Sequence, residues 1–322
     1  MSKFTSFLSA QIESFIAYRT ASENWNDSYE FMLTRFDNHC LTNYPGATEL
    51  SQEMVDGWCK RHDTEKSNSC RTRIYAVYNL IKYLRARGET DVSPPLIPRK
   101  ERRTYIPHAF TDDELAAFFK ACDSLPGTPN RLEIRSRKIT IPVFFRLMYS
   151  SGIRTNEARL LRTADVDLTH GILNIQRSKG IDQHYVVLHD SMLELMKRYD
   201  AAISKLYPDR TYFFPSMKGG YHGKLWLQQN FNRLWAQVSS ARATAYTLRH
   251  HYAVTNINSW IDVGFGFDDK LLYLSKSMGH RDIEDTKYYY SLVPGMADIL
   301  EEKTNTDFED IVPEVDYEEV QQ

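Results

Sequence analysis

The stretch Leu274–Tyr290 reads Leu-Ser-Lys-Ser-Met-Gly-His-Arg-Asp-Ile-Glu-Asp-Thr-Lys-Tyr-Tyr-Tyr. In it, the pair Gly279–His280 is followed six residues later by Thr286 and nine residues later by Tyr289. A Tyr hydroxyl has an unperturbed pKa of about 10, so it is a weak nucleophile at neutral pH. It does covalent chemistry only where positive charge and hydrogen-bond donors surround its target. If Tyr289 is a nucleophile, the rest of the chain has to supply those groups.

Two Arg-containing segments upstream are candidates for this task. The first is Ser151-Gly-Ile-Arg154-Thr-Asn-Glu157, and the second is Tyr246-Thr-Leu-Arg249-His-His-Tyr-Ala253. Arg suits a phosphodiester because its planar, permanently charged fork can bind two oxygens at once. Glu157 stands one helical turn from Arg154, where a carboxylate can orient the guanidinium. An Arg-x-x-Glu pair is also common as a plain surface ion pair, which is the alternative interpretation of the first segment.

In this order, the segments resemble the motifs of the tyrosine recombinase (phage integrase) family over most of residues 109–290. The resemblance implies a site with two Arg residues that clamp the phosphate, an acid that supports the first Arg, a hydrogen-bond donor to the phosphoryl group, and a nucleophile. These residues are, in chain order, Arg154, Glu157, Arg249, His280 and Tyr289. Each segment alone is a modest signal, whereas the ordered set is specific.

The resemblance extends to a Lys and leaves the register of the nucleophile open. Lys179 lies in the turn between two expected strands and resembles the family's Lys that protonates the leaving 5′ oxygen. An alkoxide leaves poorly unless it receives a proton in the transition state, so the role is chemically sensible. A Lys in a turn can also be merely solvated. Tyr288 and Tyr290 flank Tyr289 and are alternative nucleophiles, and aromatic packing in a core would explain one or two of the three.

One position departs from the family pattern. The residue three before the second Arg is usually His, and here it is Tyr246. His250 matches the ordinary residue after the Arg and does not replace the missing group. A Tyr can donate a hydrogen bond to a phosphoryl oxygen or relay a proton, but it is a poorer neutral-pH base than imidazole. The substitution therefore leaves the identity of the general base open.

The first 92 residues are expected to form a helical bundle. Apolar residues recur at three- and four-residue spacing in 4–16 and 29–36, and 48–58 and 67–87 have the same character. In length and pattern this bundle resembles the family's SAM-like, DNA-binding core-binding domain. Residues 93–108 contain prolines at 94, 95, 98 and 107 and are expected to be a linker. Its basic residues are candidates for contacts with a phosphate backbone, although a solvated connector would look the same: Arg99, Lys100, Arg102 and Arg103.

Residues 109–294 are expected to form the catalytic domain. Residues 139–150 are apolar enough for a buried helix, and 166–170, 171–177 and 184–188 alternate like the strands of an antiparallel sheet. Helices are expected at 197–206, 225–238 and 246–258, and 264–269 is expected to be a loop. The predicted fold is therefore mainly α with a small antiparallel β-sheet. Residues 295–322 are expected to form a C-terminal helix and an acidic tail.

The charge distribution agrees with a protein that binds phosphate groups, once the acidic residues 301–322 are left out of the count. The net charge is −2, but residues 301–322 hold nine Asp and Glu residues and only one Lys. The remaining residues carry 39 Lys and Arg against 33 Asp and Glu, a net charge of +6. There is no apolar run of about 20 residues and no apolar signal segment, so a cytoplasmic protein without a membrane partner is expected. The four dispersed Cys residues predict free thiols, and no metal site is expected.

The resemblance implies a site-specific DNA recombinase or integrase that cleaves and rejoins DNA through a 3′-phosphotyrosyl intermediate, without a metal or another cofactor. The implied partners are double-stranded DNA recombination sites and other copies of the chain, in a tetramer whose C-terminal segments dock in trans. An accessory directionality or DNA-bending protein is a further implied partner. Two alternatives remain: a DNA relaxase of the type IB topoisomerase sort, and a catalytically silent DNA-binding regulator.

Overall fold

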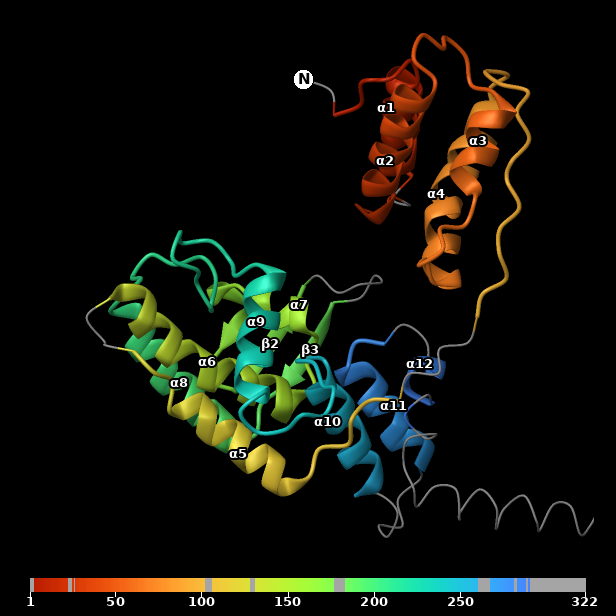
Figure 1. Ribbon diagram of the computed structural model, residues 1–322. Coiled ribbons are helices and arrows are strands. Elements are labelled where there is room, and N and C mark those ends of the chain that lie inside the picture. Colours follow the sequence, from red (N-terminus) through yellow and green to blue (C-terminus); the bar gives the residue numbers. More distant parts are fainter. Residues whose placement is uncertain are drawn as a thin grey trace, which may run out of the picture. The chain divides into compact units, whose positions relative to one another are not determined.

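The computed structural model of the protein describes residues 3–22, 25, 27–101, 106–127, 131–176, 183–259, 267–280, 283–287 and 289. The chain divides into two compact units, Met1–Tyr105 and Ile106–Gln322, which are described here separately (Figure 1). The finer boundaries at 92 and 108 stay predictions. Of the basic linker residues, Arg99 and Lys100 are described and exposed, whereas Arg102 and Arg103 lie outside the described residues.

The first unit is a helical bundle. Its helices are α1 Ser9–Ala21, α2 Asp27–Asn43, α3 Gln52–Cys59 and α4 Ser67–Ala86. Helix α4 packs against the other three. Ile12 and Phe15 are both buried, and so are Leu33 and Phe36. Since residues three apart share a helix face, this spacing gives each helix one apolar side to bury.

The second unit combines helices with a small sheet. Its helices, apart from one 3₁₀ turn at Thr163–Asp165, are α5 Asp112–Asp123, α6 Leu132–Ser151, α7 Thr155–Leu160, α8 Asp190–Ser204, α9 Lys224–Trp235, α10 Thr247–Asn258, α11 Phe267–Ser277 and α12 Glu284–Lys287. Helix α6 packs against α5, α8 and α10 (Figure 1). Its Phe144 and Phe145 are fully buried beside Phe118 of α5 and Phe231 of α9.

The sheet is antiparallel, with strands in the order β1 Val166–Asp167, β2 Ile172–Ile175 and β3 His184–Val187. Leu173 stands opposite Val166 on one side and Val186 on the other. Leu173 and Val186 are buried, so the sheet turns one face toward the core, as the alternation predicted. The predicted fold class, mainly α with a small antiparallel sheet, is confirmed.

Two predicted elements have other boundaries in the structure, and a third predicted element lies outside the described residues. Helix α8 begins at Asp190, seven residues before the predicted start, because His189 caps it. The predicted loop 264–269 is wrong in its second half, since α11 begins at Phe267 and packs against β3. The predicted C-terminal helix and tail, 295–322, lie outside the described residues. In the part of the chain that is described, every helix is too short or too polar to cross a membrane.

Candidate active site

The first Arg is positioned by the end of α6 and the start of α7. Gly152 ends α6 in the left-handed conformation, with φ of +63°, and its N–H donates to Met148 O. Two residues later, the backbone N–H of Arg154 donates to Glu157 Oε2 at 2.9 Å, and its guanidinium donates to Glu157 Oε1 at 2.7 Å. Glu157 is buried, so one carboxylate holds both the main chain and the side chain of Arg154.

The second Arg lies on α10 and is fully enclosed. Arg249 is 0% exposed, and its Nη1 donates to Gly152 O at 2.5 Å. Its Nη2 donates to Met278 O at 2.7 Å and to His280 Nε2 at 2.9 Å. Arg249 Nε is buried, and within the described part of the chain no hydrogen-bond acceptor meets it. The guanidinium is therefore fixed while part of its donor capacity is unused.

The turn after α11 holds both Arg residues. Gly279 O accepts a hydrogen bond from Arg154 Nη2 at 2.5 Å, one residue after the carbonyl that Arg249 uses. Gly279 has φ of +63°, and a Cβ at this position would lie 2.5 Å from His184 Cε1 and 3.0 Å from Arg154 Nη1. Only Gly fits here, because another residue would be strained in its backbone and would also collide with the site.

His280 connects the turn to the second Arg. Arg249 can only donate, so His280 Nε2 is the acceptor, and the ring proton lies on Nδ1, which donates to Thr286 Oγ1 at 2.6 Å. Burial and the positive charges of Arg249 and Arg154 lower the pKa of His280 to about 3. The imidazole is thus neutral at pH 7 in this arrangement. Thr286, which is fully buried, fixes its tautomer.

Tyr289 packs directly beside this cluster. Its side chain is 2% exposed and belongs to a small core with Ala253, Ile257, Leu274 and Met278. Its ring is stacked on the His280 ring, with 6.2 Å between centroids and 11° between planes. The ring of His250 lies 5.5 Å away at a tilt of 54°. The phenol is therefore held among side chains of α10 and of the turn after α11.

Tyr246 stands at the start of α10, and its aromatic ring contacts Arg249 and His250. The Arg249 guanidinium lies 6.0 Å from the Tyr246 ring centroid, and the His250 ring meets that ring edge-on at 5.0 Å. Tyr246 is 37% exposed, so one side of it faces solvent. The residue that replaces the usual His thus borders both Arg249 and His250.

The structure brings Arg154, Glu157, Arg249, His280 and Tyr289 into one connected cluster, with Tyr246 at its edge. Lys179, Tyr288 and Tyr290 lie outside the described residues, so nothing here bears on them.

Two further His residues border the cluster: the sequence analysis gave no role to His184 and treated His250 as the ordinary residue after the Arg. His184 of β3 has its Nε2 3.9 Å from Glu157 Oε2 and is buried, and no motif pointed to it. His250 had a usable signal, because it stands one helical turn after Tyr246 and next to Arg249.

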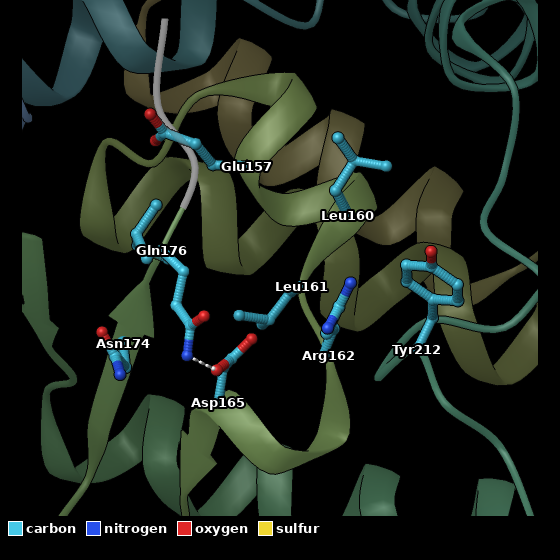
Figure 2. Close-up of a pocket in the computed structure, with 9 residues that line it drawn as sticks. Glu157, Leu160, Leu161, Arg162, Asp165, Asn174, Gln176 and Tyr212 are labelled. Atoms are coloured by element: carbon cyan, nitrogen blue, oxygen red, sulfur yellow. Dashed lines mark hydrogen bonds between the residues drawn. The ribbon is translucent and has the colours of Figure 1, made fainter. Parts of the chain in front are cut away.

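A separate cavity of about 150 Å³ lies beside Glu157 and is drawn in Figure 2. Its lining is mixed, with the acids Glu157 and Asp165, the base Arg162, and the polar Gln176 and Tyr212. Gln176 donates to Asp165 across 2.6 Å (Figure 2). Neither Arg154 nor Arg249 lines it, so the cavity adjoins the cluster through Glu157 but does not contain its two guanidinium groups.

Comparison with known proteins places the chain in a family. A family model described as "Phage integrase family" matches residues 108–294. The Sinorhizobium fredii protein y4rE, which carries an integrase/recombinase name, is 30% identical over 73% of this chain and 75% of its own length. Tyrosine recombinase XerD of Rickettsia bellii is 20% identical over 89% of this chain and 94% of its own.

Solved structures share the fold. The recombinase XerH bound to a palindromic difH substrate, in a post-cleavage complex, has a TM-score of 0.60 and 18% identity over 86% of this chain and 78% of that one. A lambda integrase tetramer bound to a Holliday junction has a TM-score of 0.57 and 14% identity over 88% of this chain and 76% of that one. Because the family match covers more than half of the sequence, this protein belongs to the phage integrase family of tyrosine recombinases.

Proposed function

We propose that this protein is a site-specific DNA recombinase in which Tyr289 cleaves one strand and keeps it as a 3′-phosphotyrosyl link. The proposal rests on one observation: side chains from distant segments of the chain converge on the turn after α11. Arg154 and Gly279 are 125 residues apart in the sequence, yet they are joined by a 2.5 Å hydrogen bond, and Arg249 reaches the same turn from a third segment. A surface ion pair at Arg154 would need none of these long-range contacts.

The proposed reaction is an in-line displacement at phosphorus. The Tyr289 oxygen attacks, the bond to the 5′ oxygen breaks, and negative charge grows on the non-bridging oxygens. Arg154 and Arg249 stabilise that charge, and their bonds to Glu157 and to three main-chain carbonyls preorganise them before substrate arrives. The buried Nε–H of Arg249 meets no acceptor among the described residues, so it is proposed as a further donor to the phosphoryl group.

The remaining proposed roles concern the proton that the leaving 5′ oxygen needs and the hydrogen bonds to the phosphoryl group. Lys179 is proposed to protonate the leaving 5′ oxygen, and Tyr246 to donate a hydrogen bond to the phosphoryl group. His280 becomes a donor to that group only if its Nε2 gains a proton, since Nε2 now accepts from Arg249. The phosphotyrosine keeps the energy of the broken bond, so rejoining needs no nucleotide, and the cationic side chains do the charge stabilisation that a divalent metal does elsewhere.

Duplex DNA carrying a recombination site is the proposed substrate, because the XerH structure named above contains its difH substrate. Assembly into a tetramer is proposed on the likeness to the lambda integrase tetramer. In that assembly residues 295–322 would dock on a neighbouring subunit, and Arg99, Lys100, Arg102 and Arg103 would contact the phosphate backbone. An accessory protein that sets direction or bends DNA is a further proposed partner.

A suicide substrate with a nick beside the scissile phosphate tests this function. The wild-type protein is expected to become covalently attached to the DNA, whereas Tyr289→Phe should bind the same DNA without forming the adduct. A protein that binds but never forms an adduct would instead be a silent regulator, the reading that Tyr246 motivates. Exchange between two marked sites, compared with relaxation of a supercoiled plasmid that has no site, separates a recombinase from a type IB relaxase.

A further inference from the structure

We propose that His250 positions Tyr289 and accepts the proton of its hydroxyl during cleavage, the task left open by Tyr246. This inference rests on the function proposed above, because it assumes that Tyr289 is the nucleophile. It assigns a role to a residue that the sequence motifs treat as ordinary.

The contacts of His250 connect the two tyrosines of the site. It stands on α10, one turn after Tyr246 and next to Arg249. Its ring centroid is 5.5 Å from that of Tyr289 and 5.0 Å from that of Tyr246, which it meets at 76°. Tyr246, which stands at the family's His position, therefore contacts His250, and His250 contacts Tyr289.

The other candidates for proton acceptor are less suitable. Both nitrogens of His280 are engaged, since Nε2 accepts from Arg249 and Nδ1 donates to Thr286. Tyr246 carries a phenol, which is no more basic than the phenol of the attacking residue. Arg154 and Arg249 carry no lone pair to accept a proton. The proposal therefore assigns the proton to the His250 imidazole, whose ring lies against that of Tyr289.

The surroundings of His250 keep it in the form that can accept a proton. Burial and the charge of Arg249 lower the pKa of His250 to about 4, so the imidazole is neutral at pH 7. The Arg249 guanidinium acts on His250 by its charge, and the rings of Tyr246 and Tyr289 lie 5.0 and 5.5 Å from its own. Such an imidazole is a weak base, so it takes the proton only as the oxygen–phosphorus bond forms, when the phenol becomes far more acidic.

The proton account of the step is balanced. As the Tyr289 oxygen bonds to phosphorus, its proton passes to His250 and the bond from phosphorus to the 5′ oxygen breaks. The leaving 5′ oxygen takes a proton from Lys179. On rejoining, the 5′ hydroxyl returns its proton to Lys179 and Tyr289 regains its own from His250, so no oxidant, metal or other reactant is consumed.

His250→Phe tests the inference against a matched neighbour. Phe keeps an aromatic ring against Tyr289 but has no nitrogen. The control is His251→Phe on the same helix, where the His ring stacks on Tyr149 at 5.5 Å and approaches Phe110 at 6.0 Å, away from the cluster. On the nicked suicide substrate, His250→Phe is expected to cleave on the order of 100-fold more slowly than the control. Equal rates for the two variants would overturn the proposal.

A substrate with sulfur in place of the bridging 5′ oxygen separates the two proton transfers. A thiolate leaves without protonation, so Lys179→Ala should recover most of its cleavage rate on this substrate, while His250→Phe stays slow. Recovery of His250→Phe to the rate of His251→Phe would contradict the assignment.

His250→Asn adds a variant that offers hydrogen bonds but cannot take a proton at neutral pH. It is also expected to be slow, and a wild-type rate would overturn the proton-acceptor role. Circular dichroism and DNA binding by each variant check that the fold is kept. Wild-type protein without an adduct would refute the proposed function itself, whereas an adduct in wild type and in His250→Phe alike would refute only this inference.

Discussion

Arg249 Nη2 donates a hydrogen bond to His280 Nε2 across 2.9 Å, and this bond fixes the state of both residues. It makes His280 an acceptor on that nitrogen and a donor to Thr286 on the other. It also places a neutral imidazole, rather than a second cation, against a guanidinium that is fully buried. A phosphoryl oxygen that accepts the hydrogen bond of Arg249 Nη2 in place of His280 would free His280 Nε2, so substrate binding and the state of His280 are expected to be linked.

Thr286→Val removes the hydroxyl that accepts from His280 Nδ1 and keeps the shape of the side chain. The buried Nδ1–H then loses its partner, which costs about 1–3 kcal/mol and releases the ring to turn. We expect cleavage of the suicide substrate to slow by about tenfold or more. Thr255→Val on the exposed part of α10 is the control and should leave the rate within about twofold. If both variants cleave alike, the 2.6 Å contact to His280 has no role in the reaction.

Gly279→Ala should damage the site more than its backbone strain explains. An L-residue in the left-handed conformation costs about 1–2 kcal/mol at either Gly279, with φ of +63°, or Gly219, with φ of +76°. A Cβ at Gly219 meets no atom within 4 Å, whereas at Gly279 it would press on His184 and Arg154. Both variants should therefore lose similar backbone stability in urea unfolding, while Gly279→Ala alone should lose at least tenfold in cleavage rate. Matching cleavage rates would argue against the role of the turn.

Glu157→Gln tests the carboxylate behind Arg154. The Arg154 N–H and Nη1 donate to different oxygens, at 2.9 and 2.7 Å, and in Gln an NH2 donor replaces one of these oxygens, so one of the two bonds loses its acceptor. We expect DNA binding to change little and cleavage to fall by about tenfold, because the guanidinium loses its alignment. Asp123→Asn, which alters the exposed ion pair with Arg146, is the control and should leave cleavage unchanged. Weakened binding with an unchanged cleavage rate would contradict this account.

Stability is expected to fall below pH 6.5 because of a buried His outside the site. Burial and the charge of Arg159 lower the pKa of His222 to about 4, and its ring is stacked on Trp226 at 3.6 Å. The unfolded chain binds this proton near pH 6.5 and the folded chain only near 4, so the stabilisation is complete above 6.5 and is lost as the pH falls toward 4.

In urea unfolding at pH 5, 6 and 7, His222→Gln should therefore reduce the dependence of the unfolding free energy on pH by up to about 1.4 kcal/mol per pH unit. A wild-type slope in His222→Gln would show that this His is not held neutral by the fold.

The sequence could predict those parts of the site whose residues are close together in the chain or follow a family pattern. Arg154 and Glu157 are three residues apart, and their pairing follows from helical geometry. The order of the two Arg segments, His280 and Tyr289 matched a family pattern. The contacts of Gly279 with Arg154 and of Gly152 with Arg249 carry no local signal, because packing joins residues 125 and 97 positions apart.

Two failures of the sequence reasoning have physical causes. His189 caps α8 by accepting from Ser191 N at 3.3 Å, but His is not among the residues that usually mark a helix start, so the prediction began too late. His184 is a buried residue in a short strand, where alternation predicts burial but not a charged neighbour. Lys179 and the flanking Tyr288 and Tyr290 keep the roles that the resemblance implies, as predictions.

The central claim is that Tyr289 is the residue that becomes joined to DNA. It is tested by trapping wild-type protein on a nicked suicide substrate, digesting the complex with protease and nuclease, and identifying the nucleotide-linked peptide by mass spectrometry. We predict a nucleotide on Tyr289 through a 3′ phosphate, and no such peptide from Tyr289→Phe. A nucleotide on Tyr288 or Tyr290, or an adduct that persists in Tyr289→Phe, would contradict the account.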